Sequence, residues 1–183
     1  MERYTTFDPN AELNGRTVLG FIRNVNHEDI ESILIRHHLN KIDPEKWYNL
    51  QALLDVLTDI SNDFNSTENL VAVGIAAGEL GIMYLPPELK NFTREQLFES
   101  YDRLLYATRH RGNAGNITFV KESPTHFKMI THIPYPDDIF YGVFYAYLRH
   151  FNQPGGHFIL RYDDTAPRHD HGGPTTIYHI EIS

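Results

Sequence analysis

Apolar residues in the first two thirds of the chain recur three or four positions apart, which is typical of amphipathic helices. The clearest run extends from Trp47 to Ile60, and Pro44 suits the first position of a helix there. Thr93 and Gln96 have the spacing of a capping box and open a later helix. The pattern predicts helices over 16–25 (where a strand is the alternative), 27–39, 44–60, 67–84 and 93–108.

After Gly112 the period changes to strict alternation of apolar and polar residues, which is typical of β-strands. Two such runs form a predicted hairpin, a helix follows, and two further runs close the chain. This order predicts an α+β fold in which N-terminal helices pack on an antiparallel sheet. We expect one domain over 17–183 and a loose N-terminal arm over 1–16. The predicted strands are 116–122, 126–133, 157–164 and 175–183, with a helix over 137–151.

Charge and composition exclude several classes of partner. The 183 residues include 24 acidic and 16 basic side chains and no cysteine, so disulfides and thiolate metal ligands are absent. Apart from Arg109 and Arg111 there is no Lys/Arg cluster, and we therefore expect no nucleic-acid partner. The most apolar run, 70–85, contains Glu79 and is shorter than the roughly 20 residues that span a bilayer. We expect a cytoplasmic protein without a membrane partner.

The helix over 137–151 is unusually rich in aromatic residues. Such a helix either fills a core with rings or lines a pocket for an apolar ligand. The tyrosine hydroxyls favour the pocket, because buried hydroxyls need hydrogen-bond partners; ring packing in a core remains the alternative. The rings fall in two adjoining rows, Phe140, Phe144, Tyr147 and Phe151 in one and Tyr141 and Tyr145 in the other.

The helix over 67–84 contains several glycines, among them Gly74 and Gly78 at a four-residue spacing. Each glycine costs a helix about 1 kcal/mol relative to alanine, so close approach of a neighbour is the expected reason. That neighbour is another helix of the domain, the same helix of a second subunit, or a ligand. From this spacing we predict a symmetric homodimer with the helix at its interface and Glu79 near the polar rim.

Motifs for catalysis and for metal binding are weak. The chain has no Gly-x-Ser-x-Gly motif and no phosphate-binding loop after a strand, and we expect no enzymatic activity. No two of its eleven histidines are four residues apart, the spacing of a helical metal pair. His169 and His171 are the best local candidates, but they lie in a Gly/Pro-rich loop where solvated polar residues are common. We therefore expect no metal.

The chain resembles the ligand-binding fold shared by haem–nitric-oxide-binding sensors, 4-vinyl-reductase domains and Golgi transport-particle subunits. The resemblance covers residues 17–183 and rests on the order of elements, on "WYNLQALLDVL", on "NF" before the fourth helix and on "PDDIFYGVFYAYLRHF". It implies a cavity between helices and sheet. The haem members carry a Tyr-x-Ser-x-Arg motif that has no counterpart here. The resemblance assigns no histidine as iron ligand, although His132 and His150 lie near the elements that would supply one.

Together these observations predict a non-enzymatic sensory domain that binds an apolar or aromatic small molecule between the helices 137–151 and 67–84. A protein-interaction or dimerisation module with a self-filled core is the alternative, and a haem-based gas sensor is a further one. We predict no cofactor and give haem a low weight. The expected ligand-binding residues are Phe140, Tyr141, Phe144, Tyr145, Tyr147, Gly74 and Gly78.

Overall fold

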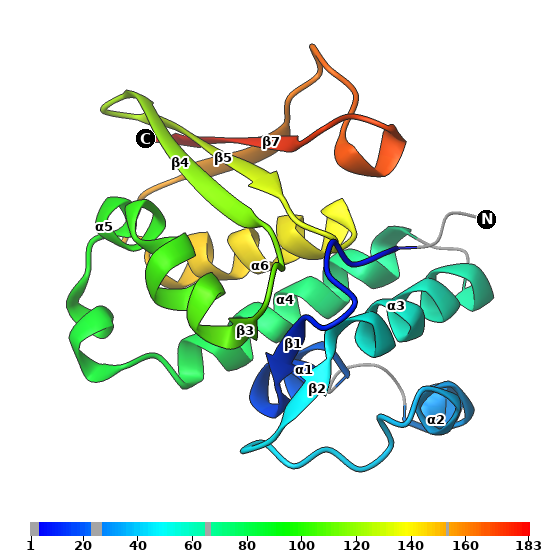
Figure 1. Ribbon diagram of the computed structural model, residues 1–183. Helices are drawn as coiled ribbons and strands as arrows, with labels where there is room; N and C mark the ends of the chain where they lie inside the picture. Colours follow the sequence, from blue (N-terminus) through cyan, green and yellow to red (C-terminus); the bar gives the residue numbers. More distant parts are fainter. Residues whose placement is uncertain (1–3, 23–26, 65–66, 153) are drawn as a thin grey trace.

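The computed structural model describes residues 4–22, 27–64, 67–152 and 154–183, and it confirms the α+β fold (Figure 1). A four-stranded antiparallel sheet has the strand order β4-β5-β7-β6. Helix α6 (Asp137–His150) lies against one face of this sheet, and helix α4 (Thr67–Met83) packs on the far side of α6 (Figure 1). Both predicted hairpins are present, with strands β4 (Asn116–Ser123), β5 (His126–His132), β6 (Phe158–Tyr162) and β7 (Thr176–Ile182).

The helical layer follows the predicted order with shifted boundaries. Thr93 and Gln96 form the predicted capping box at the start of α5. The helix expected from there to residue 108 is broken, because α5 gives way to a π-helical segment η2 and a 3-10 turn η3. The helical elements are α1 (Gly15–Ile22), α2 (His27–Arg36), α3 (Leu50–Phe64), α4 (Thr67–Met83), η1 (Pro87–Asn91), α5 (Arg94–Glu99), η2 (Asp102–Tyr106) and η3 (Ala107–Arg109).

A second, small sheet was not predicted. Strand β1 (Glu12–Asn14) pairs on its two sides with β2 (Trp47–Asn49) and β3 (His110–Arg111). The prediction that Pro44 begins a helix is therefore wrong, since Trp47 lies in a strand and α3 begins at Leu50. The described part of the expected N-terminal arm is packed rather than loose, because Leu13 is fully buried and pairs with two strands.

The glycines of α4 bring it into contact with α6. A Cβ on Gly74 would lie 2.0 Å from the carbonyl oxygen of Ile139, and one on Gly78 would lie 2.7 Å from the Cβ of Ala146. Of the three neighbours considered for these glycines, another helix of the same domain is the one found. The predicted pocket between the two helices is absent at Gly74 and Gly78, and these glycines no longer support a homodimer.

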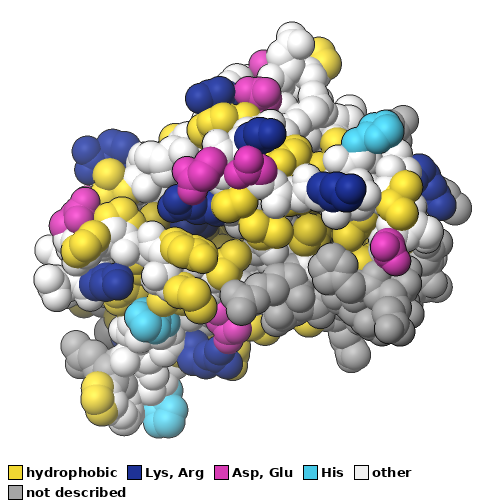
Figure 2. Space-filling model, turned by 90° about the horizontal axis from the view of Figure 1, so that it is seen from below, with side chains coloured by type: hydrophobic (Ala, Val, Ile, Leu, Met, Phe, Trp, Pro, Cys, Tyr) yellow, Lys and Arg dark blue, Asp and Glu magenta, His cyan; other side chains and the backbone are white. Residues whose placement is uncertain are grey.

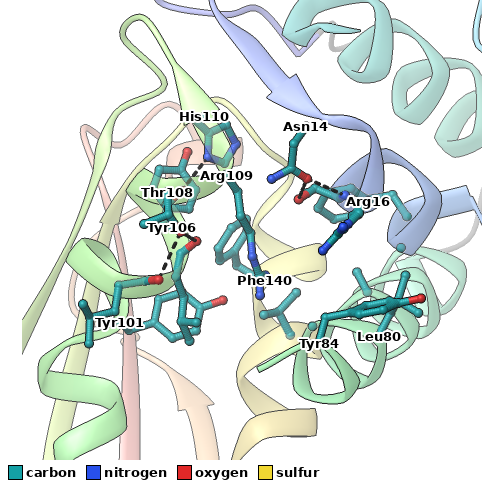
Figure 3. Close-up of a pocket in the computed structure, with 18 of the residues that line it drawn as sticks. Asn14, Arg16, Leu80, Tyr84, Tyr101, Tyr106, Thr108, Arg109, His110 and Phe140 are labelled. Atoms are coloured by element: carbon teal, nitrogen blue, oxygen red, sulfur yellow. Dashed lines mark hydrogen bonds between the residues drawn. The ribbon is translucent and has the colours of Figure 1, made fainter. Parts of the chain in front are cut away.

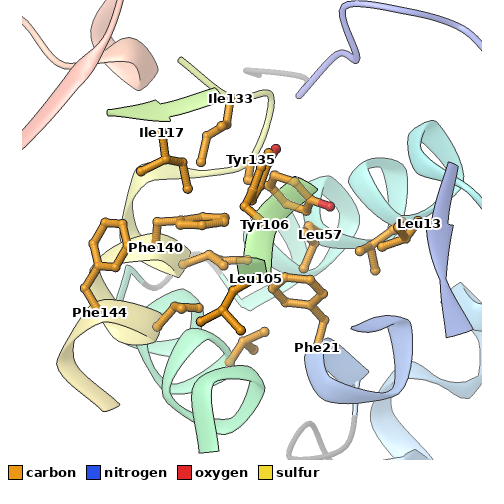
Figure 4. Packing of buried hydrophobic residues seen from close by; sticks show 14 of the residues in the cluster. Leu13, Phe21, Leu57, Leu105, Tyr106, Ile117, Ile133, Tyr135, Phe140 and Phe144 are labelled. Atoms are coloured by element: carbon orange, nitrogen blue, oxygen red, sulfur yellow. The ribbon is translucent and has the colours of Figure 1, made fainter. Parts of the chain in front are cut away.

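The rings of α6 separate into three groups. Phe144 is fully buried and meets Phe98, Tyr101 and Tyr178 edge to face, so it belongs to the packed core (Figure 4). Tyr141 and Tyr145 face the sheet, where the Tyr141 hydroxyl donates to the Leu160 carbonyl at 2.8 Å and Tyr145 contacts Phe158. Phe140 and Tyr147 face the helical layer instead.

The surface of the helical side carries charges of both signs. In the view from below, Lys and Arg side chains are scattered among acidic and hydrophobic ones (Figure 2). Glu79, expected at the rim of an interface, is exposed and forms an ion pair with Arg149 of α6. Among the described residues, no helix combines the length and apolar character needed to cross a bilayer.

Two glycine-to-alanine substitutions test the contact between α4 and α6. In Gly74→Ala, the new methyl group has no space, and we expect the free energy of unfolding to fall by about 1–3 kcal/mol. Gly20→Ala is the matched control, because its Cβ would lie 3.4 Å from the nearest atom and alanine favours a helix by about 1 kcal/mol. Urea denaturation measures both variants. Equal stability of the two would contradict the close packing.

Candidate functional site

A cavity of about 210 Å³ lies between α1, α4, the η2–η3 segment and α6 (Figure 3). A more open hollow on the surface adjoins it, since Arg16, Leu80 and Tyr84 line both. We name the inner space the Arg109 cavity, after the cation that extends into it. Its apolar walls are formed by Phe21, Ala77, Leu80, Leu104, Leu105 and Phe140.

Arg109 is a half-buried cation without a carboxylate partner. Its guanidinium lies over Gly81 of α4, where a Cβ would come within 3.1 Å of Nη2, so the glycine makes room for it. The guanidinium donates a long hydrogen bond of 3.4 Å to the Tyr147 hydroxyl. Within the described ranges, no Asp or Glu lies within ion-pair distance of Arg109.

Tyr101 supplies a second polar group without a partner. Its side chain is only 2% exposed and lines the cavity, yet its hydroxyl has no hydrogen-bond partner in the described part of the chain. Burial raises the pKa of this hydroxyl, so it stays protonated and can donate. An unpaired cation and an unpaired donor thus line the same apolar space.

His110 is held in a single neutral form. Its Nδ1 lies 2.8 Å from the carbonyl oxygen of Tyr106, and its Nε2 lies 2.6 Å from the Tyr135 hydroxyl. Burial, assisted by the neighbouring Arg109 cation, lowers the pKa of His110 to about 4. The carbonyl can only accept, so Nδ1 carries the proton and Nε2 accepts from Tyr135. Both ring nitrogens are engaged.

Two polar side chains lie at the mouth of the cavity. The Arg16 guanidinium forms an ion pair with Glu45 and lies 5.6 Å from the centre of the Tyr84 ring. Asn14 accepts hydrogen bonds from the backbone and hydroxyl of Thr17, which fixes the start of α1. Arg16 is therefore already neutralised, whereas Arg109 is not.

Of the predicted ligand-binding residues, only Phe140 lines the Arg109 cavity. Tyr147 does not line the cavity, but its hydroxyl accepts a hydrogen bond from Arg109, which does. The other five residues belong to the core, to the sheet face of α6 or to the crossing of the two helices, so they are not brought together with Phe140 in a pocket. The sequence marked Arg109 only as part of a small basic pair. It gave no sign that Tyr101, His110 and Tyr135 line the same cavity.

The histidines singled out from the sequence lie elsewhere. His132 is exposed and stacks on Phe7, with ring centres 4.6 Å apart, and His150 is exposed at the end of α6. His169 and His171 diverge: His171 lies 2.8 Å from an Arg168 nitrogen, whereas His169 lies beside Asp170. Among the described residues, His110 is the histidine that lines the cavity.

The arrangement of helices and sheet is that of the H-NOX proteins. An H-NOX protein from S. oneidensis in the Fe(II)NO state matches with a TM-score of 0.73 and 13% identity, over 93% of this chain and 99% of that one. A mutant H-NOX protein from K. algicida in the unliganded Fe(II) state matches with a TM-score of 0.70, 12% identity and coverage of 93% and 97%. An oxygen-binding H-NOX domain related to soluble guanylate cyclases has a TM-score of 0.64, 10% identity and coverage of 92% and 91%.

No family model and no curated protein matches the sequence. The chain therefore has the H-NOX fold, as the resemblance implied, at identities that establish the fold alone. Some of the matching structures were solved for work on haem distortion in the H-NOX family.

The residues of the Arg109 cavity do not fit haem in this arrangement. The cavity is smaller than the roughly 300–1,000 Å³ of pockets for drug-sized ligands, and a porphyrin is larger than most such ligands. An iron ligand needs a free imidazole nitrogen, but the Nε2 of His110 accepts from Tyr135. The apolar walls and the free cation of Arg109 would suit a porphyrin edge with carboxylates, but the space and the iron ligand are missing.

The state of His110 predicts a pH dependence of stability. Its folded pKa of about 4 lies below the ordinary value of 6.5, so between these pH values the unfolded chain binds a proton that the folded chain does not. Stability from this group is complete above pH 6.5 and is lost as pH falls toward 4, by about 2–3 kcal/mol. Denaturation at pH 7 and 4.5 should show a smaller loss in His110→Gln than in wild type. The exposed His157→Gln is the control, and an unchanged loss in His110→Gln would contradict the neutral buried state.

Proposed function

We propose that the chain is a non-enzymatic sensory domain whose Arg109 cavity binds a flat, largely apolar molecule with an anionic group. The observation that carries this proposal is the Arg109 guanidinium, which lies without a carboxylate partner in a cavity whose walls are largely apolar. Because the H-NOX fold is shared with proteins solved in complexes with oxygen and nitric oxide, binding and sensing are the activities that the fold favours.

The charge of Arg109 determines the polar end of the ligand. A cation removed from water is costly unless an anion or several acceptors face it. The planar guanidinium fork matches a carboxylate, to which it can donate two parallel hydrogen bonds. The Tyr101 hydroxyl lines the same space and can donate a further hydrogen bond to the ligand. These groups favour a carboxylate over a neutral polar group.

The walls of the cavity determine the rest of the ligand. Phe21 of α1 and Phe140 of α6 present rings, and Leu80 and Leu105 present aliphatic side chains. Figure 3 shows Phe140 and Leu80 on this lining. Rings and branched side chains around a small space favour a flat apolar body. The volume of about 210 Å³ limits this body to one or two fused rings.

Haem-based gas sensing is the second candidate. The comparisons favour it over a smaller apolar ligand, because several proteins with this fold were solved in an Fe(II) state or studied for the distortion of their haem. Haem is also a flat apolar molecule with carboxylates, so it belongs to the chemical class that the cavity selects. Its size and its need for an iron ligand count against it here, since Tyr135 occupies the Nε2 of His110.

A matched pair of ligands tests the anionic group. The probes are 2-naphthoate and its neutral amide, 2-naphthamide, which have the same ring system and nearly the same size. We expect wild-type protein to bind the carboxylate at least tenfold more tightly in calorimetric titration. Arg109→Met keeps an apolar chain of similar length and should remove this preference. Arg103→Met, on the exposed side of the same segment, should keep it.

The naphthoate experiment separates two kinds of failure. Equal binding of both probes by wild type would contradict the role of Arg109. If folded wild-type protein binds neither probe, the proposal of a small-ligand cavity is overturned. The interaction module with a self-filled core is then the favoured function.

An absorption spectrum decides the haem alternative. We expect protein purified from haem-supplemented cells to show no stoichiometric Soret band, and haemin titration to produce none, because no imidazole nitrogen in the cavity is free. A stoichiometric band that shifts with carbon monoxide would instead establish a haem protein. Loss of that band in His110→Ala, but not in His150→Ala, would then identify His110 as the iron ligand.

A further inference from the structure

Three potential metal ligands converge where the β6–β7 connection meets the start of α6. Asp137 lies in the first turn of α6, and His169 and Asp170 belong to the 3-10 turn η4 (His169–His171). One ligand atom from each side chain lies within 4.8 Å of the others. We name these three residues the Asp137 cluster. They come from segments more than thirty positions apart, which is why the sequence pointed to His169 and His171 instead.

Backbone hydrogen bonds hold the two carboxylates together. The Asp137 N–H donates to Oδ2 of Asp170 at 2.7 Å, and the Asp170 N–H donates to Oδ2 of Asp137 at 3.0 Å. Thr176 of β7 donates its hydroxyl to Oδ1 of Asp137 and accepts from the His169 N–H at 2.8 Å. The geometry of the cluster is therefore set by the fold and not by loose surface side chains.

Two buried atoms of the cluster have no partner. Nδ1 of His169 and Oδ1 of Asp170 are both inaccessible to solvent, and neither has a hydrogen-bond partner in the described ranges. The Asp170 side chain is only 11% exposed, and the two atoms lie 4.0 Å apart. A buried polar atom without a partner costs about 1–3 kcal/mol, so such atoms are rare in folded proteins. Two in one cluster indicate a missing ligand.

The charges of the cluster favour a cation. The side chains of Asp137 and Asp170 lie side by side, and each accepts a hydrogen bond from the backbone N–H of the other residue. The nearest cation, Arg168, donates to Asp138 at 3.2 Å and lies 4.0 Å from the centre of the Tyr162 ring. A proton on Asp170 would not satisfy His169, because 4.0 Å is too long for a hydrogen bond. An ion between the two atoms would satisfy both.

We propose that Asp137, His169 and Asp170 bind a divalent transition-metal ion, with zinc as the best match. Zinc lies about 2.0–2.2 Å from nitrogen and carboxylate ligands, so two donors of one tetrahedral ion lie about 3.4 Å apart. Nδ1 of His169 and Oδ1 of Asp170, now 4.0 Å apart, would have to approach by about half an ångström to bind one ion. The imidazole favours zinc over magnesium and calcium, which prefer oxygen ligands. An open hollow on the surface, lined by Phe7, His169 and Asp170, adjoins the cluster.

Zinc binding to the full chain tests the proposal. Equilibrium dialysis against ZnCl₂ should give one tightly bound ion per chain, and zinc should raise the melting temperature. Dialysis against MgCl₂ or CaCl₂ should give no tight binding. His169→Gln and Asp170→Asn should each weaken zinc binding at least tenfold. His169→Cys should restore it, because a thiolate is also a zinc ligand.

His171→Gln is the matched control, because His171 lies in the same turn but outside the cluster. It should bind zinc as wild type does. Melting curves without zinc establish that each variant is folded. If the double variant His169→Gln/Asp170→Asn is folded and binds zinc as wild type does, the ion is held by other histidines and the site is refuted. A wild type that binds no zinc refutes it as well.

Discussion

At the crossing of α4 and α6, the carbonyl oxygen of Ile139 occupies the space that a Cβ on Gly74 would fill. The carbonyl of Val71 does the same for Gly142 from the other side. Two helices can approach this closely only where both lack side chains, and the contact fixes their angle and their rotation. Once α6 is fixed, Phe144 must enter the core and Tyr141 must face the sheet. The positions of the cavity and of the Asp137 cluster depend on this one contact.

The same helix also explains why Arg109 can exist as an unpaired cation. Gly81 lies one turn beyond Gly78, and the Tyr147 hydroxyl of α6 and the Arg109 guanidinium take the place of the absent side chain. Arg109 and His110 are adjacent in the sequence but have different protonation states. The guanidinium stays charged because its intrinsic pKa is very high, whereas burial makes the imidazole neutral. The cavity thus combines one unpaired permanent charge with neutral polar groups.

The features that could be predicted from the sequence were those with a long local pattern. Alternation over seven or eight residues identified the hairpins, and the Thr93 capping box was found where expected. The strands β1, β2 and β3 contain two or three residues each, too few for any period to be recognised. For this reason Trp47 was assigned to a helix, although it pairs with Asn14 in a strand.

The site was less predictable than the fold because its residues are distant in the sequence. The aromatic residues of α6 attracted attention as a group, but a helix divides its side chains among three neighbours, and only Phe140 faces the cavity. Arg109 indicates a ligand site only because no carboxylate of the described residues lies near it, and the sequence does not show this. Nor does the sequence show that His169 meets Asp137, since Thr176 and the backbone of Asp170 bring them together.

The two sites lie at opposite ends of one short connection. Tyr135 donates to His110 at the cavity, and Asp137, two residues later, holds η4 through Asp170. Pro136 between them limits the backbone to few conformations. A ligand can shift a conformational equilibrium only through contacts that differ between the two states. The Tyr135 hydroxyl is such a contact, because a ligand that competes for His110 must displace it. Tyr135 and Asp137 thus join the hydrogen bond at His110 to the start of α6 and to the β6–β7 connection.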